Sequence, residues 1–136
     1  MSDKNLTEIK INSSGKTQVI DITRKVADAV GASGVKDGMC FVYVPHTTAG
    51  VTINENADPD VKSDILMGLG EIVPGDLDYA HAEGNSPAHI KASLLGSSAS
   101  VFVSGGKPVL GTWQGVYFCE FDGPRPRKVY VKVIGG

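Results

Sequence analysis

The segment Thr112–Phe121, TWQGVYFCEF, decides the fold class of this chain. Side chains alternate between the two faces of a strand. One face carries Trp113, Tyr117, Cys119 and Phe121, and the other carries Gln114, Val116, Phe118 and Glu120. Because neither set is a plain solvent face, we expect the strand to be covered twice. A second sheet on one side and a neighbouring subunit on the other would cover it, which predicts a homotrimer whose interface includes the Gln114–Glu120 face.

Other strands are expected on both sides of this segment, because short runs with apolar alternation recur along the chain. They are Thr7–Ile11 and Thr17–Ile22, joined as a hairpin around Ser13-Ser14-Gly15, then Met39–Val44, Val51–Asn54, Ala99–Ser104 and Lys128–Ile134. Met39–Val44 is apolar on both sides, as in a strand buried on both faces. The pattern predicts an α+β fold, an antiparallel two-sheet β-sandwich with about three flanking helices.

Three helices are expected from their start signals, since Ser, Thr and Asp cap helices and proline suits a first helical position. Thr23 begins a helix that ends near Gly31 or Gly34. Asp58-Pro59 begins the second, whose apolar face is formed by Val61, Ile65, Leu69 and Ile72. Ser86-Pro87 begins the third, which ends at Gly96.

Length and composition exclude several classes of protein. A chain of 136 residues suits one domain, 1–136, and a net charge of −2 gives no general attraction to nucleic acid or anionic membranes. Met1–Asn5 lacks the apolar core of a signal peptide, and no apolar run is long enough to cross a bilayer. Cys40 and Cys119 lie in separate apolar runs, which predicts reduced core thiols in a cytoplasmic protein.

The stretch Asp78–His89, DYAHAEGNSPAH, holds two of the three histidines. His89 falls in the first turn of the third helix, where the helix dipole favours anions over an imidazolium. A neutral imidazole in this place suits a metal ligand, a general base or a phosphate contact. A half-buried polar residue that closes a helix start is the structural alternative.

Four clusters of polar residues are candidates for a site. They are His46-Thr47-Thr48; Asn54 to Asp58; His81, Asn85 and His89; and Trp113-Gln114 with Glu120, Asp122, Arg125 and Arg127. Each has a structural alternative as a turn, a cap or an ion pair. No zinc motif and no phosphate-binding glycine loop is present. Together the clusters supply imidazoles, carboxylates and guanidinium groups, which suit a phosphorylated ligand with or without a metal.

The segments HTTAGVTINENADPDV, YAHAEGNSPAHIKASLLGSS and GTWQGVYFCEFDGPRPRKV resemble the YjbQ family, whose members are often called secondary thiamine-phosphate synthases. The resemblance runs from Ile9 to Val133, and GTWQ and EFDGPR are its most specific parts. One departure is Ser97–Val103, where a proline is expected before the apolar run. The resemblance implies a two-sheet sandwich, a homotrimer and a weak synthase activity that joins a hydroxymethylpyrimidine diphosphate to a thiazole phosphate and expels diphosphate.

The resemblance also points to individual residues. The catalytic candidates are His46, His81, His89, Glu120 and Asp122. The ligand-binding candidates are Thr47, Asn54, Asn56, Asn85, Trp113, Gln114, Arg125 and Arg127. His46, His81 and His89 are also the candidate ligands for a divalent metal, Mg²⁺ or Zn²⁺, and we expect these three side chains to converge.

Two functions remain open at this stage. In the synthase, Arg125 or Arg127 and the third helix would stabilise the departing diphosphate, and Trp113 would stack on the pyrimidine or lie in the core. The alternative is a non-catalytic trimer that binds a phosphorylated metabolite or a metal ion, since no acid–base pair or nucleophile is readable. Nucleic-acid binding is disfavoured because the basic stretch around Arg125 is short.

Overall fold

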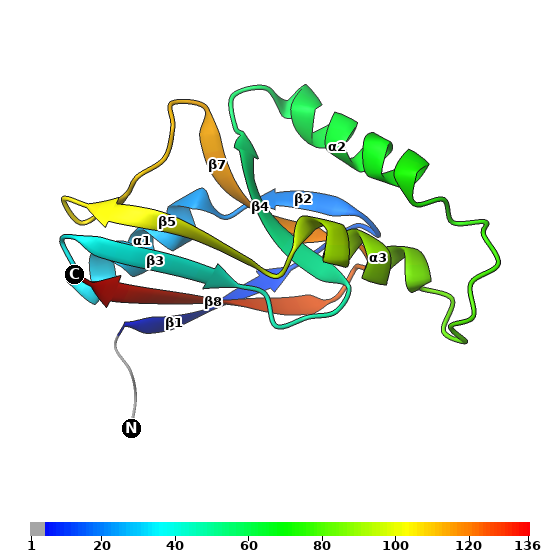
Figure 1. Cartoon of the computed structure of the whole chain (residues 1–136), viewed down its shortest axis with the longest axis horizontal. Coiled ribbons are helices and arrows are strands. Elements are labelled where there is room, and N and C mark those ends of the chain that lie inside the picture. Colours follow the sequence, from blue (N-terminus) through cyan, green and yellow to red (C-terminus); the bar gives the residue numbers. More distant parts are fainter. Residues whose placement is uncertain (1–4) are drawn as a thin grey trace.

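The computed structural model describes residues 5–136, so the prediction made for Met1–Asn5 lies almost wholly outside the described residues. Figure 1 shows the order of the elements along the chain. They are β1 Leu6–Asn12, β2 Gln18–Asp21, α1 Thr23–Ser33, β3 Gly38–Tyr43, β4 Ala49–Glu55, α2 Pro59–Ile72, α3 Ser86–Leu95, β5 Ser98–Ser104, β6 Lys107–Pro108, β7 Gln114–Glu120 and β8 Pro126–Gly135.

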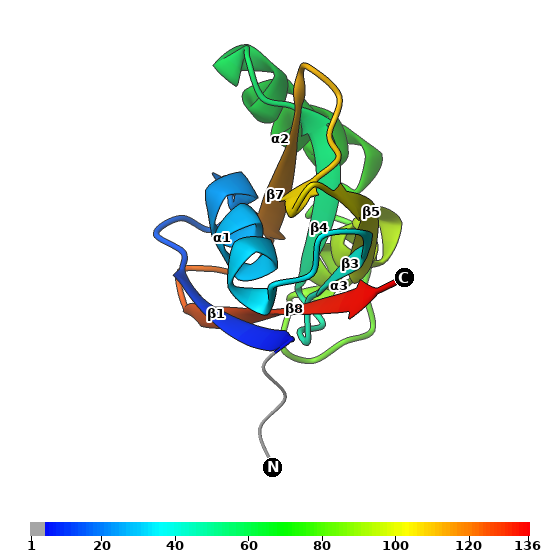
Figure 2. The same ribbon diagram turned by 90° about the vertical axis from the view of Figure 1, so that its left-hand side faces the viewer.

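Two antiparallel sheets form the body of the protein, which confirms the predicted α+β class. The larger sheet has the strand order β1-β8-β3-β5-β6, and the smaller has the order β2-β7-β4. Seen end-on in Figure 2, α1 lies in the angle between β1 and β8 of one sheet and β4 and β7 of the other. Helices α2 and α3 lie on the far side of the smaller sheet from α1.

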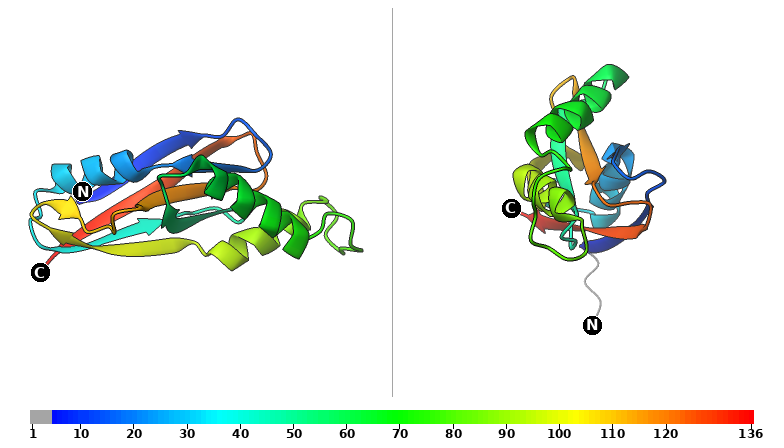
Figure 3. Two further views of the ribbon diagram at one scale, coloured as in Figure 1. Left: turned by 90° about the horizontal axis from the view of Figure 1, so that it is seen from above. Right: turned by 90° about the vertical axis from the view of Figure 1, so that its right-hand side faces the viewer.

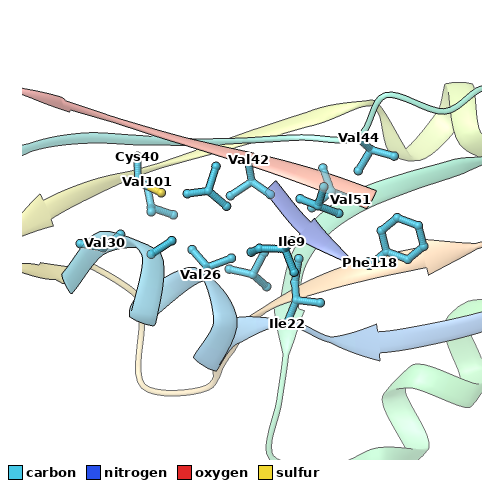
Figure 4. Close-up of a cluster of buried hydrophobic side chains, with 14 of the residues drawn as sticks. Ile9, Ile22, Val26, Val30, Cys40, Val42, Val44, Val51, Val101 and Phe118 are labelled. Carbon is cyan, nitrogen blue, oxygen red and sulfur yellow. The ribbon is translucent and has the colours of Figure 1, made fainter. Parts of the chain in front are cut away.

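The main core fills the space between the sheets and α1. Figure 4 shows Val26 and Val30 of α1 directed towards Val42 and Val101 of the larger sheet, with Phe118 of β7 closing one end of the cluster. The predicted inward face of the last strand is confirmed, because Val129, Val131 and Val133 are all buried. Burial of these branched side chains supplies most of the folding free energy, at about 25 cal/mol per Å² of apolar surface.

The predicted hairpin between the first two strands is wrong. β1 pairs with β8 in the larger sheet, whereas β2 pairs with β7 in the smaller one. The turn around Ser13 therefore crosses from one sheet to the other. Its side chain explains the crossing, because the Ser13 hydroxyl donates to the Glu120 carboxylate at 2.7 Å and accepts the Arg125 backbone N–H at 3.0 Å.

Both faces of β7 are covered, as predicted, but the prediction that a neighbouring subunit covers one of them is wrong. Val116 and Phe118 face the main core, and the opposite face packs against the protein's own helices. Tyr117, Cys119 and Phe121 there contact Ala88 and Ala92 of α3 and the leucines of α2. No neighbouring subunit is needed at this strand, and the Gln114–Glu120 face gives no reason for a trimer.

Strand β3 is less covered than predicted, because the sequence predicts burial on both of its faces. Cys40 and Val42 are buried, but Phe41 is 40% exposed and Tyr43 is 49% exposed. Phe102 on neighbouring β5 is 67% exposed on the same outer face. The outer face of the larger sheet therefore carries exposed aromatic side chains among its charged residues, and exposed aromatic groups of this kind are typical of interaction surfaces.

The helix starts are partly as predicted. The Asp58 side chain accepts the Asp60 N–H at 2.9 Å and Pro59 follows, which confirms that cap. At α3 the N-cap is Asn85 rather than Ser86, and it makes no side-chain cap bond. Thr23 is the first helical residue of α1 rather than its cap, because the N-cap is Ile22, which makes no side-chain cap bond. Asp21 accepts the Thr23 N–H at 2.9 Å just before the helix.

Two further features agree with the sequence. Within residues 5–136 no helix is both long and apolar enough to cross a membrane. Cys40 and Cys119 are free and buried, and burial raises their thiol pKa values to about 11 and about 12. Both thiols therefore stay protonated and act as core residues.

Candidate functional site

The three histidines converge at one end of the molecule. The loop before β4 and the start of β8 lie beside α3 in the right half of Figure 1, and Figure 3 shows the loop before α3 projecting beyond them. They enclose an open pocket of about 430 Å³, called here the histidine pocket. Its lining residues are Pro45, His46, Thr47, Thr48, His81, Glu83, Asn85, His89, Arg125 and Arg127.

His46 is held in one tautomer by the backbone of β8. Its Nε2 accepts the Lys128 N–H at 3.0 Å, so the neutral ring carries its proton on Nδ1. Burial, assisted by the positive charge of Arg127, lowers the pKa of His46. The imidazole is therefore neutral at pH 7 and offers an N–H donor from Nδ1.

His81 and His89 lie edge to face, with their ring centroids 5.3 Å apart. Asn85 lies between them in the chain, and its Nδ2 donates to the Asp122 carboxylate at 3.0 Å. The Asn85 Oδ1 is buried and has no hydrogen-bond partner within residues 5–136. An unpaired buried acceptor costs free energy, and a ligand that donates a hydrogen bond would relieve that cost.

The start of α3 offers few free backbone donors. Pro87 has no N–H, and the N–H groups of Ala88 and His89 donate to the Asn85 carbonyl oxygen at 3.0 and 3.4 Å. These two N–H groups are therefore engaged within the helix start rather than free for a ligand. The helix dipole still points its positive end at the pocket.

Glu120 and Arg127 form a buried ion pair beneath the pocket. Their side chains are 0% and 4% exposed, and the Arg127 Nε donates to the Glu120 Oε1 at 2.8 Å. Arg127 also donates to the Thr48 hydroxyl at 2.8 Å. Burial acts to raise the pKa of Glu120, but hydrogen bonds from Arg127, Ser13 and the Asp122 N–H outweigh it and the pKa is lowered. Both groups are thus engaged with each other.

Asp122 and Arg125 form a second pair nearer the surface. The Arg125 Nη2 lies 3.0 Å from the Asp122 Oδ2, and the two side chains are 50% and 9% exposed. Asp122 also accepts from Asn85 and, at 3.0 Å, from Lys16. The Asn85 hydrogen bond is the main cause that lowers the pKa of Asp122, and Lys16 and Arg125 add to it. The exposed guanidinium of Arg125 keeps further N–H donors for the pocket.

The turn between Asp122 and Arg125 is packed too closely at Gly123 for any side chain. A Cβ on Gly123 would meet the Gly15 carbonyl oxygen at 2.3 Å and the Ser13 hydroxyl at 2.8 Å. Only glycine fits between these groups. The close approach holds Asp122 and Arg125 in place at the pocket rim.

Four of the candidate residues lie elsewhere. Asn54, Trp113 and Gln114 line a separate hollow at the far end of β4, at the top of Figure 1. Asn56 also lies there and accepts the Tyr117 hydroxyl at 2.5 Å. The seven residues of β4 separate the two groups by about 20 Å, at ~3.3 Å per residue. Within one chain these four residues do not reach the histidine pocket.

The described residues do not fit a protein-bound metal ion. No group of three His, Cys, Asp or Glu side chains is arranged to hold one within residues 5–136. The Nε2 lone pair of His46 is already used by the Lys128 N–H, and Nδ1 carries the proton. His46 is therefore a hydrogen-bond donor here rather than a metal ligand.

A family model described as "UPF0047 protein YjbQ-like" matches residues 7–136. This chain belongs to the YjbQ-like UPF0047 family. It is similar to a UPF0047 protein of Methanocaldococcus jannaschii, with 52% identity over 97% of this chain and 96% of the relative. It is also similar to YugU of Bacillus subtilis, with 49% identity over 96% of this chain and 99% of the relative.

Solved structures of YjbQ-like proteins share the fold. A protein of Clostridium acetobutylicum is 60% identical, with a TM-score of 0.92 and coverage of 94% of this chain and 99% of that chain. A protein of Sulfolobus solfataricus, of unknown function, is 33% identical, with a TM-score of 0.93 and coverage of 96% of each chain. The predicted family and fold are therefore confirmed.

Sequence reasoning missed Pro45 and Glu83, which line the histidine pocket, and it missed the residues that hold the acidic groups beside the pocket. Ser13 and Lys16 bind Glu120 and Asp122 from more than 100 positions away in the chain. Nothing near them in the sequence points to that contact. Thr48 was recognisable as a member of the His46-Thr47-Thr48 cluster, but its role as a buried partner of Arg127 depends on the fold.

Proposed function

We propose that the histidine pocket binds the phosphate group of a small phosphorylated metabolite. The observation that carries this proposal is the convergence of three imidazoles and the exposed guanidinium of Arg125 around one open pocket. Among residues 5–136, Glu83 is the one carboxylate that lines it. Such a set of donors suits a phosphate, which accepts several charge-assisted hydrogen bonds at once.

Individual donors have distinct roles in this proposal. Arg125 presents a planar fork that can bind two phosphate oxygens. His46 donates from Nδ1, and the exposed Thr47 hydroxyl lies beside it. The unpaired Oδ1 of Asn85 would accept from an N–H or O–H group of the same ligand. The pocket therefore favours an organic phosphate that also carries a donor.

The reaction that this pocket would support is the one implied by the family resemblance. The thiazole nitrogen lone pair forms a bond to the methylene carbon of the pyrimidine substrate, while the bond from that carbon to the diphosphate oxygen breaks. The electron pair leaves with diphosphate, and no proton has to move. Arg125 and His46 would stabilise the charge that develops on the departing group.

A non-catalytic binding protein is the second candidate, and one observation favours it. Both acidic candidates for catalysis are occupied, because Glu120 is paired with Arg127 and Asp122 is held by Asn85, Lys16 and Arg125. A general acid or base would have to break these contacts first. The synthase needs neither, so steady-state turnover separates the two candidates.

We also propose that the protein acts as a homotrimer in the cytoplasm. The support for self-association is the group of exposed aromatic side chains on the outer face of the larger sheet, Phe41, Tyr43 and Phe102. The α2 helix adds Met67 and Ile72, both largely exposed. Light scattering at micromolar concentration tests the assembly, and a monomer there would contradict it.

The test of function is a paired measurement of binding and turnover. Calorimetry should detect thiazole phosphate binding, and chromatography should detect thiamine phosphate formed from both substrates. A kcat/KM of about 10⁴ M⁻¹s⁻¹ or more indicates a dedicated enzyme. Tight binding with background turnover indicates a binding protein. No binding of either substrate would reject the synthase.

Two variants complete this test. Asn85→Ala removes a side chain that lines the pocket and should weaken binding. Gln114→Ala changes the start of β7, in the hollow beside the far end of β4. It should leave binding unchanged if one chain holds the whole site. Weakened binding in Gln114→Ala would instead mean that a second subunit supplies Gln114.

A further inference from the structure

A second pocket lies behind the start of α3, on the other side of Asn85 from the histidine pocket. It has a volume of about 290 Å³ and is called here the lysine pocket. Its lining residues are Lys16, Thr17, Gly70, Val73, Gly75, Gly84, Asn85, Pro87, Ala88, Lys91 and Phe121. None of the candidate residues except Asn85 belongs to it.

Two lysines, Lys16 and Lys91, line this pocket, and they differ in their ion-pair partners. Lys16 pairs with the Asp122 carboxylate at 3.0 Å. Asp122 is already shared with Arg125 and Asn85. Lys91 is half-buried, and within residues 5–136 it takes part in no ion pair. The pocket therefore holds a partly desolvated ammonium group with no counter-charge.

The electrostatics of Lys91 agree with this geometry. Burial lowers the pKa of Lys91, and the positive charge of Lys16 lowers it further. A cation that is partly buried beside another cation lowers the stability of the free protein. An anion placed between the two ammonium groups would remove that cost, so the pocket favours an anion.

The walls and floor of the pocket restrict the kind of anion. Val73, Ala88 and Phe121 are buried and form an apolar floor. Gly70 and Gly75 on the wall have open space where a side chain would stand, which leaves room for a ligand to approach the backbone. An anion with an apolar body matches both features better than a bare inorganic ion.

We propose that the lysine pocket is a second ligand site, which binds the phosphate or carboxylate group of a small organic anion between Lys16 and Lys91 and its apolar part on Val73, Ala88 and Phe121. The site goes beyond the function proposed above and does not depend on it. It adds a second anion position, separated from the first by the side chain of Asn85.

The test uses phenyl phosphate as the probe and the full chain as the protein. Backbone amide resonances of Gly70, Gly75, Gly84 and Lys91 should shift and saturate as the probe is added. Benzoate tests the carboxylate arm in the same way. Inorganic phosphate should bind more weakly than phenyl phosphate, because it cannot use the apolar floor.

Lys91→Met is the decisive variant, since it removes the charge and keeps an unbranched apolar side chain. It should weaken binding of phenyl phosphate at the lysine pocket roughly 10- to 150-fold, the value of one charge-assisted hydrogen bond. Lys25→Met, an exposed position on α1, makes the same change in net charge and should leave binding unchanged.

Thermal melting supplies an independent readout. Without the probe, Lys91→Met should melt at the same temperature as the parent or higher, because it removes an unmatched charge. With the probe, only the parent and Lys25→Met should be stabilised through this site. Shifts confined to Thr47 and His89 would support the histidine pocket and overturn the lysine pocket. Equal affinities in Lys91→Met and Lys25→Met would overturn it too.

Discussion

Two acid–arginine pairs lie side by side in this protein, and they differ in burial rather than in chemistry. Glu120 pairs with Arg127, and both side chains are almost completely buried. Asp122 pairs with Arg125 in the turn that joins β7 to β8, and this arginine is half exposed. The first pair joins β7 and β8 to Thr48 and Ser13, whereas the second pair reaches the rim of the histidine pocket.

This difference in burial gives the two arginines different roles, although the two pairs look alike in the sequence. Removing one member of a buried pair leaves an uncompensated charge in the interior. An exposed pair contributes little to stability, because water screens it and long side chains lose entropy. Arg127 is thus expected to stabilise the fold, and Arg125 is the arginine available to a ligand.

The largest effect is expected from Arg127→Met. It leaves Glu120 buried without its counter-ion and should lower the free energy of unfolding by about 3–5 kcal/mol. Urea denaturation measures the loss. The double variant Glu120→Gln with Arg127→Met should recover part of it, since no buried charge remains. A loss below about 1 kcal/mol in the single variant would remove the distinction between the two pairs.

Arg125→Lys should give the opposite result. A lysine cannot reproduce the planar guanidinium fork, so affinity for thiazole phosphate should fall roughly 10- to 150-fold, equivalent to about 1.5–3 kcal/mol. Stability should hardly change, because the side chain is half exposed. Calorimetry and melting of the same sample check both points. Unchanged affinity with a lowered melting temperature would make Arg125 a structural residue.

Acid should destabilise the protein through the carboxylates of both pairs. The folded-state pKa values of Glu120 and Asp122 are lowered, so the unfolded chain binds protons first as the pH falls. Their contribution is complete above about pH 5 and declines below about pH 4, as the pH approaches the folded-state values. Urea denaturation at a series of pH values measures this decline. Glu120→Gln should flatten it, and an equal slope in this variant would contradict the assignment.

The smallest effect is expected at a pair outside the site. Lys128 lies 3.7 Å from Glu8, and the two side chains are 46% and 42% exposed. Glu8→Gln should change the free energy of unfolding by less than about 1 kcal/mol. Urea denaturation in low and high salt measures it. A larger loss would mean that burial does not explain the contrast between the other two pairs.

Part of the candidate site could be predicted from the sequence. His81, Asn85 and His89 lie within one short stretch, so their proximity follows from local geometry. His46 joins them through a contact between β8 and the loop before β4, which no local pattern contains. The far group with Trp113 and Gln114 was grouped with the site by resemblance, and the length of β4 separates it within one chain.

The sequence by itself determined the elements, because their signals are local. Alternation placed Val129, Val131 and Val133 inward, and Asp58-Pro59 started α2. Tertiary structure decided which sheet received β1 and β2, what covered β7 and which arginine stayed exposed. It also decided the tautomer of His46 and the unmatched charge of Lys91. The physical reason is that burial, pairing and desolvation depend on residues far apart in the chain, and they set the charge, the free donors and the pKa of each group.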